Sequence, residues 1–131
     1  MCLALQLQMS DNLNHIELGK AGEFMAMVFL KNKGFKLLNM NWRWSNLEVD
    51  LIMQEKNILV FVEVKTRSNG SYILPEYSVN HKKMQNLIKA AEQYLYIHKL
   101  DCEVRFDIVS ISNFPKSPNI VHFKDAFYSY N

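Results

Sequence analysis

The sequence predicts one α/β domain in which helices flank a mixed β-sheet. Residues 15–32 and 81–98 repeat apolar side chains at spacings of three and four, which is typical of amphipathic helices. Residues 46–53 and 58–65 are rich in aliphatic and β-branched side chains and enclose a short polar turn, as a β-hairpin does. A chain of 131 residues is long enough for one domain with a sizeable core.

The remaining elements complete a recognisable order. Further strands are expected at residues 35–42, 103–112 and 120–123, which gives the order α-β-β-β-α-β-β. The second helix would connect the strand at 58–65 with the strand at 103–112, so we expect a right-handed crossover between parallel strands. Residues 1–14 are expected to form a flexible N-terminal segment, and residues 15–131 the single domain.

Composition excludes several classes of protein. The hydrophobic fraction of 49% and the charged fraction of 21% are those of a soluble globular protein, and the net charge of +2 permits a nucleic-acid partner without pointing to one. Cys2 and Cys102 lack zinc or disulfide spacing, so reduced thiols and a cytoplasmic location are expected. The apolar stretch at residues 2–7 is too short to span a membrane, and no membrane association is expected. No glycine-rich phosphate loop is present, which disfavours nucleotide hydrolysis.

Acidic side chains gather at one end of the predicted hairpin. If residues 54–57 form its turn, Glu48 lies opposite Glu63. Asp50 and Lys65 fall on the same face, and the other face is wholly apolar. Like charges this close are destabilising unless an opposite charge is present. A divalent cation would supply that charge, because Mg²⁺ is held by one or two carboxylates together with waters and phosphate oxygens.

Three further side chains belong with the acids on sequence grounds. Glu23 lies at the edge of the apolar arc of the first helix, where it either faces the sheet or is an ordinary boundary glutamate. Gly19 and Gly22 on the same flank would allow close packing. Lys83 leans toward the buried side of the second helix, in a first turn where a cation opposes the helix dipole. Arg43 could pair with a carboxylate or a phosphate.

The element order and the acids together resemble the restriction-endonuclease-like superfamily. Its signature is an acid on one strand, followed on the next strand by a second acid, any residue and a lysine. The corresponding residues here are Asp50 and then Glu63-Val64-Lys65. Val49 stands where a proline commonly precedes the first acid.

Over residues 16–128 the chain also resembles the YraN-like family of uncharacterised bacterial proteins. The segments that carry this resemblance are Gly19–Glu23, Asn41–Arg43, Glu48–Ile52, Phe61–Arg67 and Arg105–Asp107. Leu47 departs from the pattern, because the family usually has a glycine there. Members of the family look like small nucleases related to Holliday-junction resolvases.

The resemblance implies metal-dependent hydrolysis of phosphodiester bonds. Asp50 and Glu63 would hold Mg²⁺ or Mn²⁺, with Glu23 as a third carboxylate, directly or through water. Lys65 would orient the attacking water or neutralise developing charge. Glu48 would be either a metal ligand or a partner of one.

Arg43, Arg67 and Lys83 are candidate phosphate contacts. Phosphate contacts carry no sequence information, so we expect selectivity for DNA structure, with branched DNA of repair or recombination among the substrates. Cutting a junction would need a symmetric homodimer. The alternatives are a nucleic-acid-binding accessory protein without turnover, in which Lys65 simply pairs with Glu63, and a protein-interaction module that uses the tail at 128–131. Intact acids count against a pure binder, which has no need of anions facing phosphate.

Overall fold

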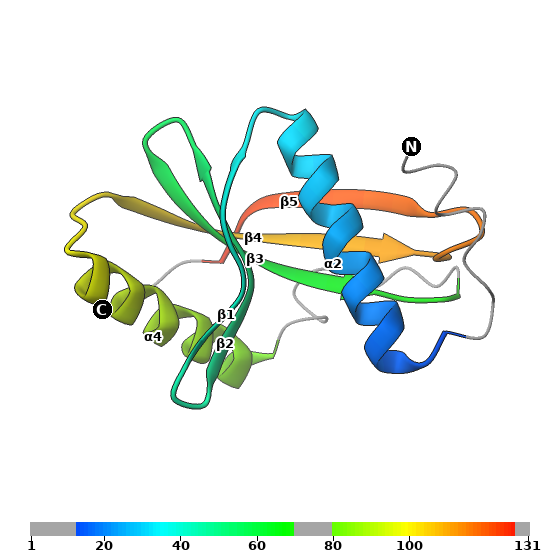
Figure 1. Cartoon of the computed structure of the whole chain (residues 1–131), viewed down its shortest axis with the longest axis horizontal. Helices are drawn as coiled ribbons and strands as arrows, with labels where there is room; N and C mark the ends of the chain where they lie inside the picture. Colours follow the sequence, from blue (N-terminus) through cyan, green and yellow to red (C-terminus); the bar gives the residue numbers. More distant parts are fainter. Residues whose placement is uncertain (1–12, 70–79, 128–131) are drawn as a thin grey trace.

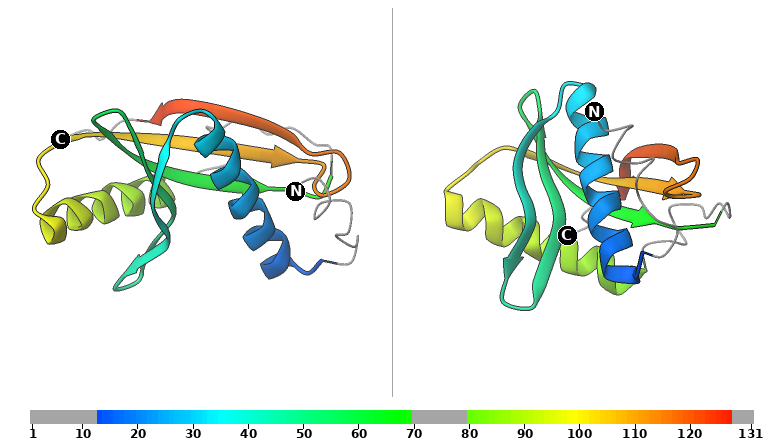
Figure 2. Two further views of the ribbon diagram at one scale, coloured as in Figure 1. Left: turned by 45° about the horizontal axis from the view of Figure 1, so that its top comes forward. Right: turned by 45° about the vertical axis from the view of Figure 1, so that its right-hand side comes forward.

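The computed structural model describes residues 13–69 and 80–127, and in these it forms a five-stranded sheet with one helix on each face (Figures 1 and 2). The elements are α2 (His15–Asn32), β1 (Lys36–Trp44), β2 (Leu47–Glu55), β3 (Ile58–Thr66), α4 (His81–His98), β4 (Glu103–Ser112) and β5 (Asn119–Phe127). This order confirms the predicted α/β class and the succession α-β-β-β-α-β-β. Residues 1–12, which make up most of the predicted N-terminal segment, lie outside the described residues. Neither described helix combines the length and the hydropathy that a membrane crossing requires.

The strands lie side by side in chain order, from β1 to β5. β3 and β4 are parallel and are connected through α4, as predicted, and the other neighbouring strands are antiparallel. β5 is longer than the predicted strand at 120–123. Its pairing with β4 is irregular between Phe106 and Ile108 and includes Phe127, although Lys124 and Asp125 interrupt the apolar pattern.

The hairpin turn is shorter than the sequence suggested. Glu55 pairs directly with Ile58, so only Lys56 and Asn57 form the turn, and Lys56 has a φ of 54°. The predicted register was therefore wrong by two residues, a shift that leaves alternation between the faces unchanged. The last pair of the β2–β3 ladder is Leu51 with Val62.

Each face of the sheet carries its own apolar core. The core beneath α2 includes Met25, Ala26, Leu30, Leu51, Met53, Val60, Val62 and Ile111. The core beneath α4 includes Leu47, Val49, Ile52, Phe61, Leu87, Ala90, Tyr94 and Phe106. The predicted single apolar face of the hairpin is thus wrong for β2, because Val49 and Leu51 belong to opposite cores. The alternation breaks at the residue between them, Asp50.

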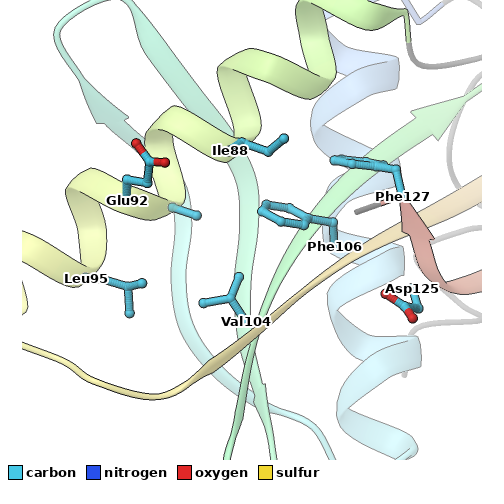
Figure 3. Close-up of a pocket in the computed structure, with 8 residues that line it drawn as sticks. Ile88, Glu92, Leu95, Val104, Phe106, Asp125 and Phe127 are labelled. Carbon is cyan, nitrogen blue, oxygen red and sulfur yellow. The ribbon is translucent and has the colours of Figure 1, made fainter. Parts of the chain in front are cut away.

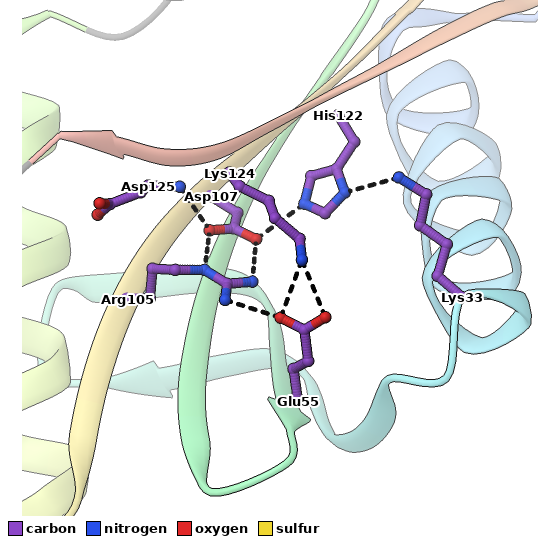
Figure 4. Close-up of polar contacts among 7 residues, drawn as sticks. All are labelled: Lys33, Glu55, Arg105, Asp107, His122, Lys124 and Asp125. Atoms are coloured by element: carbon purple, nitrogen blue, oxygen red, sulfur yellow. Dashed lines mark hydrogen bonds and ion pairs between the residues drawn. The ribbon is translucent and has the colours of Figure 1, made fainter.

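A buried ion-pair cluster ties together strands β4 and β5 and the end of β2 (Figure 4). Asp107 is fully buried and accepts hydrogen bonds from Arg105 (2.8 and 2.9 Å), from His122 Nε2 (2.8 Å) and from the backbone N–H of Asp125 (3.0 Å). Arg105 Nη1 also donates to Glu55 (2.7 Å). Burial raises the pKa of Asp107, but these donors outweigh it and hold the pKa at about 2. Asp107 is therefore a satisfied structural anion.

Candidate active site

β2 and β3 separate at a fork, and Asp50 lies in it. Figure 1 shows the β1–β2 hairpin running steeply across the other strands. Beyond the last pair, Leu51 with Val62, the strands exchange no further ladder hydrogen bonds, and Asp50 Oδ2 instead accepts the backbone N–H of Val64 at 2.9 Å. The carboxylate thus satisfies a backbone donor that the ladder leaves free. The bond lies where the side-chain alternation of β2 breaks.

Glu63 directly follows Val62, the last residue of β3 that pairs with β2. It is buried, with 3% of its surface exposed. Its Oε2 atom lies 3.5 Å from Lys65 Nζ and 3.5 Å from Lys83 Nζ. Its Oε1 atom is buried and has no hydrogen-bond partner. Lys83 reaches the site from the first turn of α4, as its position on the helix predicted. A buried carboxylate oxygen without a partner is rare in folded proteins and points to a missing one.

Glu23 approaches Asp50 from α2. Its side chain lies close enough to the side chains of Asp50 and Asn41 for both to shift its pKa. Gly22 makes this possible, because α2 packs so closely on β3 there that a methyl group would overlap the Thr66 side chain. The same expectation for Gly19 was wrong, because a methyl group there would meet no atom within 4 Å.

Asn41 belongs to the site, although the sequence analysis did not select it. It adopts a φ of 52° within β1, a left-handed conformation that asparagine tolerates better than most residues. Its side chain lines the same groove as Glu23 and lowers the pKa of that carboxyl. The available signal was an asparagine inside a strand pattern, where this residue is depleted.

Crowding of the carboxyl groups raises two pKa values. Burial is the main cause that raises the pKa of Glu63 to about 7, followed by the charge of Asp50, and Lys83 and Lys65 oppose the shift. Burial, the charge of Asp50 and the hydrogen bond with Asp50 raise the pKa of Glu23 to about 7. Strongly perturbed pKa values cluster at functional sites, and here both shifts involve Asp50.

Glu48 lies to one side of these acids. It pairs with Arg43 across the β1–β2 ladder, and the two side chains form an exposed ion pair at 3.4 Å. The predicted position opposite Glu63 was wrong, because it depended on the longer turn. A groove of about 440 Å³ lies between α2 and the hairpin. It is lined by His15, Ile16, Gly19, Lys20, Glu23, Asn41, Arg43 and Glu48.

Arg67 follows β3 and is fixed by its backbone. Its N–H donates to the carbonyl of Ile111 (2.8 Å), and its carbonyl accepts the N–H of Phe114 (3.0 Å). This anchors the chain two residues after Lys65. Residues 70–79, which come shortly after it, lie outside the described residues.

A second hollow lies away from the acids, between α4, β4 and β5 (Figure 3). Its volume is about 310 Å³, and Ile88, Ala91, Leu95, Val104, Phe106 and Phe127 form its apolar walls. Its two carboxylates, Glu92 and Asp125, come from different elements and lie at opposite sides of it. None of the predicted site residues lines it, and the fork remains the place where polar groups converge.

A family model covers the part of the chain that builds the fork. The model for the uncharacterised protein family UPF0102 matches residues 22–111. The chain belongs to this family. A UPF0102 protein of Flavobacterium johnsoniae is 46% identical over 120 residues, and one of Flavobacterium psychrophilum is 44% identical over 116 residues, with 88% of this chain and 98% of the relative covered in both cases. A UPF0102 protein of Thermodesulfovibrio yellowstonii is 40% identical over 113 residues, with 86% of this chain and 97% of the relative covered.

The UPF0102 match confirms the family resemblance seen in the sequence. The matched residues include Glu23, Asp50, Glu63, Lys65 and Lys83. The names of these UPF0102 relatives state the family and no activity. Among residues 13–69 and 80–127 of this UPF0102 protein, no three Asp, Glu, His or Cys side chains converge closely enough to form a complete metal cage. The fork instead offers Glu63, in contact with Lys65 and Lys83, within electrostatic range of Asp50.

Proposed function

We propose that this UPF0102 protein is a metal-dependent nuclease that hydrolyses phosphodiester bonds in DNA. The observation that carries this proposal is Glu63 Oε1, a buried carboxylate oxygen without a hydrogen-bond partner, next to a second carboxylate, Asp50. An unpaired buried acceptor costs free energy that a bound cation would recover.

The donor set fits Mg²⁺ or Mn²⁺. These hard cations prefer oxygen ligands, and Mg²⁺ usually takes one or two carboxylates and completes its shell with waters and phosphate oxygens. Asp50 and Glu63 would hold the ion, and Glu23 would contribute through water. A complete protein cage is not required for such a site. Glu48 would act at a distance, because it is exposed and paired with Arg43.

Each residue of the fork then has a definite task. When bound, the cation supplies a Lewis acid for the phosphoryl oxygen and lowers the pKa of a water. Asp50 keeps its orientation through the Val64 N–H. Lys65 is placed by strand alternation on the same side of β3 as Glu63, where it can orient the attacking water or neutralise charge on the phosphoryl oxygens.

The expected substrate follows from the cations around the fork. Arg43 lines the groove beside Glu23, Lys83 contacts Glu63, and Arg67 follows Lys65 by two residues in the chain. Phosphate contacts of this kind fix the position of a nucleic-acid backbone but do not read bases. We therefore propose selectivity for DNA structure, with branched DNA as the first substrate to test and a homodimer as the form that would cut a junction.

A cleavage panel tests this function. Branched, single-stranded and duplex DNA are incubated with Mn²⁺ and with wild type, Asp50→Asn or Lys65→Ala. We expect each variant to cleave on the order of 100-fold more slowly, as when one electrostatic catalytic group is removed. Lys56→Ala, at the exposed hairpin turn, is the matched control and should cleave like wild type. Equal cleavage by wild type and both site variants would contradict the proposal.

A nucleic-acid-binding protein without turnover is the second candidate. The observation in its favour is that Lys65 and Lys83 already neutralise Glu63 in the absence of a cation. A thermal-shift titration separates the two candidates. Stabilisation by Mg²⁺ or Mn²⁺ that disappears in Asp50→Asn supports the nuclease, whereas indifference of the wild type to both ions supports the binding protein.

A further inference from the structure

We propose that Lys83 is an internal counter-ion of Glu63 that a divalent cation displaces, and that the displaced ammonium group then contacts a phosphate of the substrate. This proposal rests on the proposed metal site and describes how that site changes between its free and loaded forms. It makes the phosphate contact of Lys83 conditional on the cation.

Charge balance in the free protein leads to this proposal. Two ammonium groups, Lys65 Nζ and Lys83 Nζ, contact the same oxygen of Glu63, each at 3.5 Å, while the other oxygen has no partner. Together they balance the charges of Glu63 and Asp50. With Glu23 counted as a third carboxylate beside Asp50, a bound divalent cation would still leave an excess of one positive charge, in a site where Glu63 is nearly fully buried. Like charges repel strongly in such surroundings, so one lysine has to move away.

Lys83 is the lysine that can leave. Lys65 is two residues from Glu63 on the same face of β3, so its backbone keeps the ammonium group within reach of that carboxylate, although its side chain is 32% exposed. Lys83 comes from another element, and its side chain is 38% exposed. Its flexible four-carbon stem can carry the ammonium group outward without a backbone change.

The first turn of α4 holds the Lys83 backbone in place during such a movement. Asn80 caps the helix by accepting the Lys83 N–H at 2.8 Å. This turn of α4 contains no acidic residue, so the positive charge of Lys83 opposes the helix dipole and no neighbouring side chain compensates it. Glu63 supplies that compensation in the free protein, and an anionic phosphate would supply it in the complex.

Calorimetric titration of the metal-free protein with Mn²⁺, in the absence of DNA, tests the displacement. We expect Lys83→Met to bind Mn²⁺ on the order of tenfold more tightly than wild type, because one competing charge is gone. Lys82→Met, which removes the exposed neighbouring lysine, is the matched control and should change the affinity less than about twofold. Lys83→Gln is measured as well, so that a folding defect of one variant does not decide the result.

The phosphate contact is tested by the salt dependence of DNA binding. Loss of one phosphate contact reduces the slope of log affinity against log salt by about 0.9. We expect this loss for Lys83→Met on branched DNA with Ca²⁺, used as a probe cation in place of Mn²⁺, and no change in chelator.

The outcomes separate the two proposals. Wild type that binds no Mn²⁺ would overturn the metal site and the displacement with it. Wild type that binds Mn²⁺, together with Lys83 variants of equal or weaker affinity, would overturn the displacement and leave the nuclease proposal intact. The contact is also not conditional on the cation if Lys83→Met reduces the slope of log affinity against log salt by the same amount in chelator and in Ca²⁺.

Discussion

Asp50 serves the fold and the candidate site in different ways. Its carboxylate accepts the Val64 N–H where the β2–β3 ladder ends, which an amide oxygen could do equally well. Its negative charge contributes to raising the pKa of both Glu23 and Glu63 to about 7. The charge is therefore unfavourable for the metal-free protein, and residues of this kind are typical of functional sites rather than of structural ones.

Replacement of Asp50 by Asn separates these two effects. In chelator at pH 8 we expect Asp50→Asn to raise the free energy of unfolding by about 1 kcal/mol, because it removes one of three crowded negative charges. At pH 5 the gain should shrink, since Glu23 and Glu63 are then mostly protonated in the folded protein. Urea denaturation at both pH values measures the effect. A loss of stability at pH 8, or a gain of equal size at pH 5, would contradict the electrostatic explanation.

At the scale of elements, the contact between α2 and β3 sets the position of Glu23. The contact depends on Gly22, whose missing side chain leaves room for Thr66. The neighbouring residue in the sequence is Glu23, so any displacement of the helix here also moves the carboxylate away from Asp50.

Two glycine substitutions in the same helix should therefore have opposite effects. Gly22→Ala is expected to destabilise the protein by about 1–3 kcal/mol, because the new methyl group overlaps the Thr66 side chain. Gly19→Ala, its matched control, should stabilise the protein by about 0.5–1 kcal/mol, because alanine favours the helix and nothing lies within 4 Å. Thermal denaturation of both variants measures the difference. Two effects of the same sign would show that the helix shifts freely on the sheet.

The periodicity of apolar residues predicted the helices and strands well. Features that depend on irregular backbone conformations were not predicted. The helical spacing gave both helices, with α2 at His15–Asn32 and α4 at His81–His98. The face pattern of β2 was mispredicted because the alternation breaks at Asp50, where the side chain bonds a backbone N–H, and no local sequence signal marks such a break. The turn was predicted at residues 54–57 but is shorter, because Lys56 adopts a positive φ although it is not one of the residues that usually do so. Asn41 was missed for a related reason, since its conformation within β1 follows from tertiary contacts.

Across the whole molecule, two charged clusters respond to pH in opposite directions. Asp107 and Glu55, in the cluster with Arg105, have lowered pKa values, so both contribute stability that is lost in acid. For Asp107 this loss occurs as the pH falls from about 4 toward about 2. Glu23 and Glu63 at the fork have raised pKa values. Their folded forms hold protons more tightly than the unfolded chain does, so stability falls as the pH rises from about 4.5 through 7.

Asp107→Asn tests the first cluster. We expect it to lower the free energy of unfolding at pH 7 by about 2–4 kcal/mol, because it leaves the Arg105 guanidinium without its bidentate partner. The effect should become small near pH 2, where the native carboxyl is itself half protonated. Asp101→Asn, at an exposed position, is the control and should have little effect at either pH. A loss that is equally large at pH 2 and pH 7 would point to packing rather than charge.

The two clusters together predict the pH profile of the metal-free protein and its change on metal binding. In chelator, the melting temperature should be highest at about pH 4 to 5. It should fall at lower pH, where Asp107 takes up a proton (the lower limb), and at higher pH, where Glu63 and Glu23 lose theirs (the upper limb). A divalent cation binds the deprotonated carboxylates, so Mg²⁺ should raise the melting temperature at pH 8 and leave it unchanged at pH 4. Melting curves from pH 2 to 8, with and without Mg²⁺, measure both limbs, and Asp50→Asn should show a flatter upper limb and no response to Mg²⁺. An upper limb that is the same in Asp50→Asn and in wild type would mean that the charge of Asp50 does not contribute to it and that burial alone raises the two pKa values.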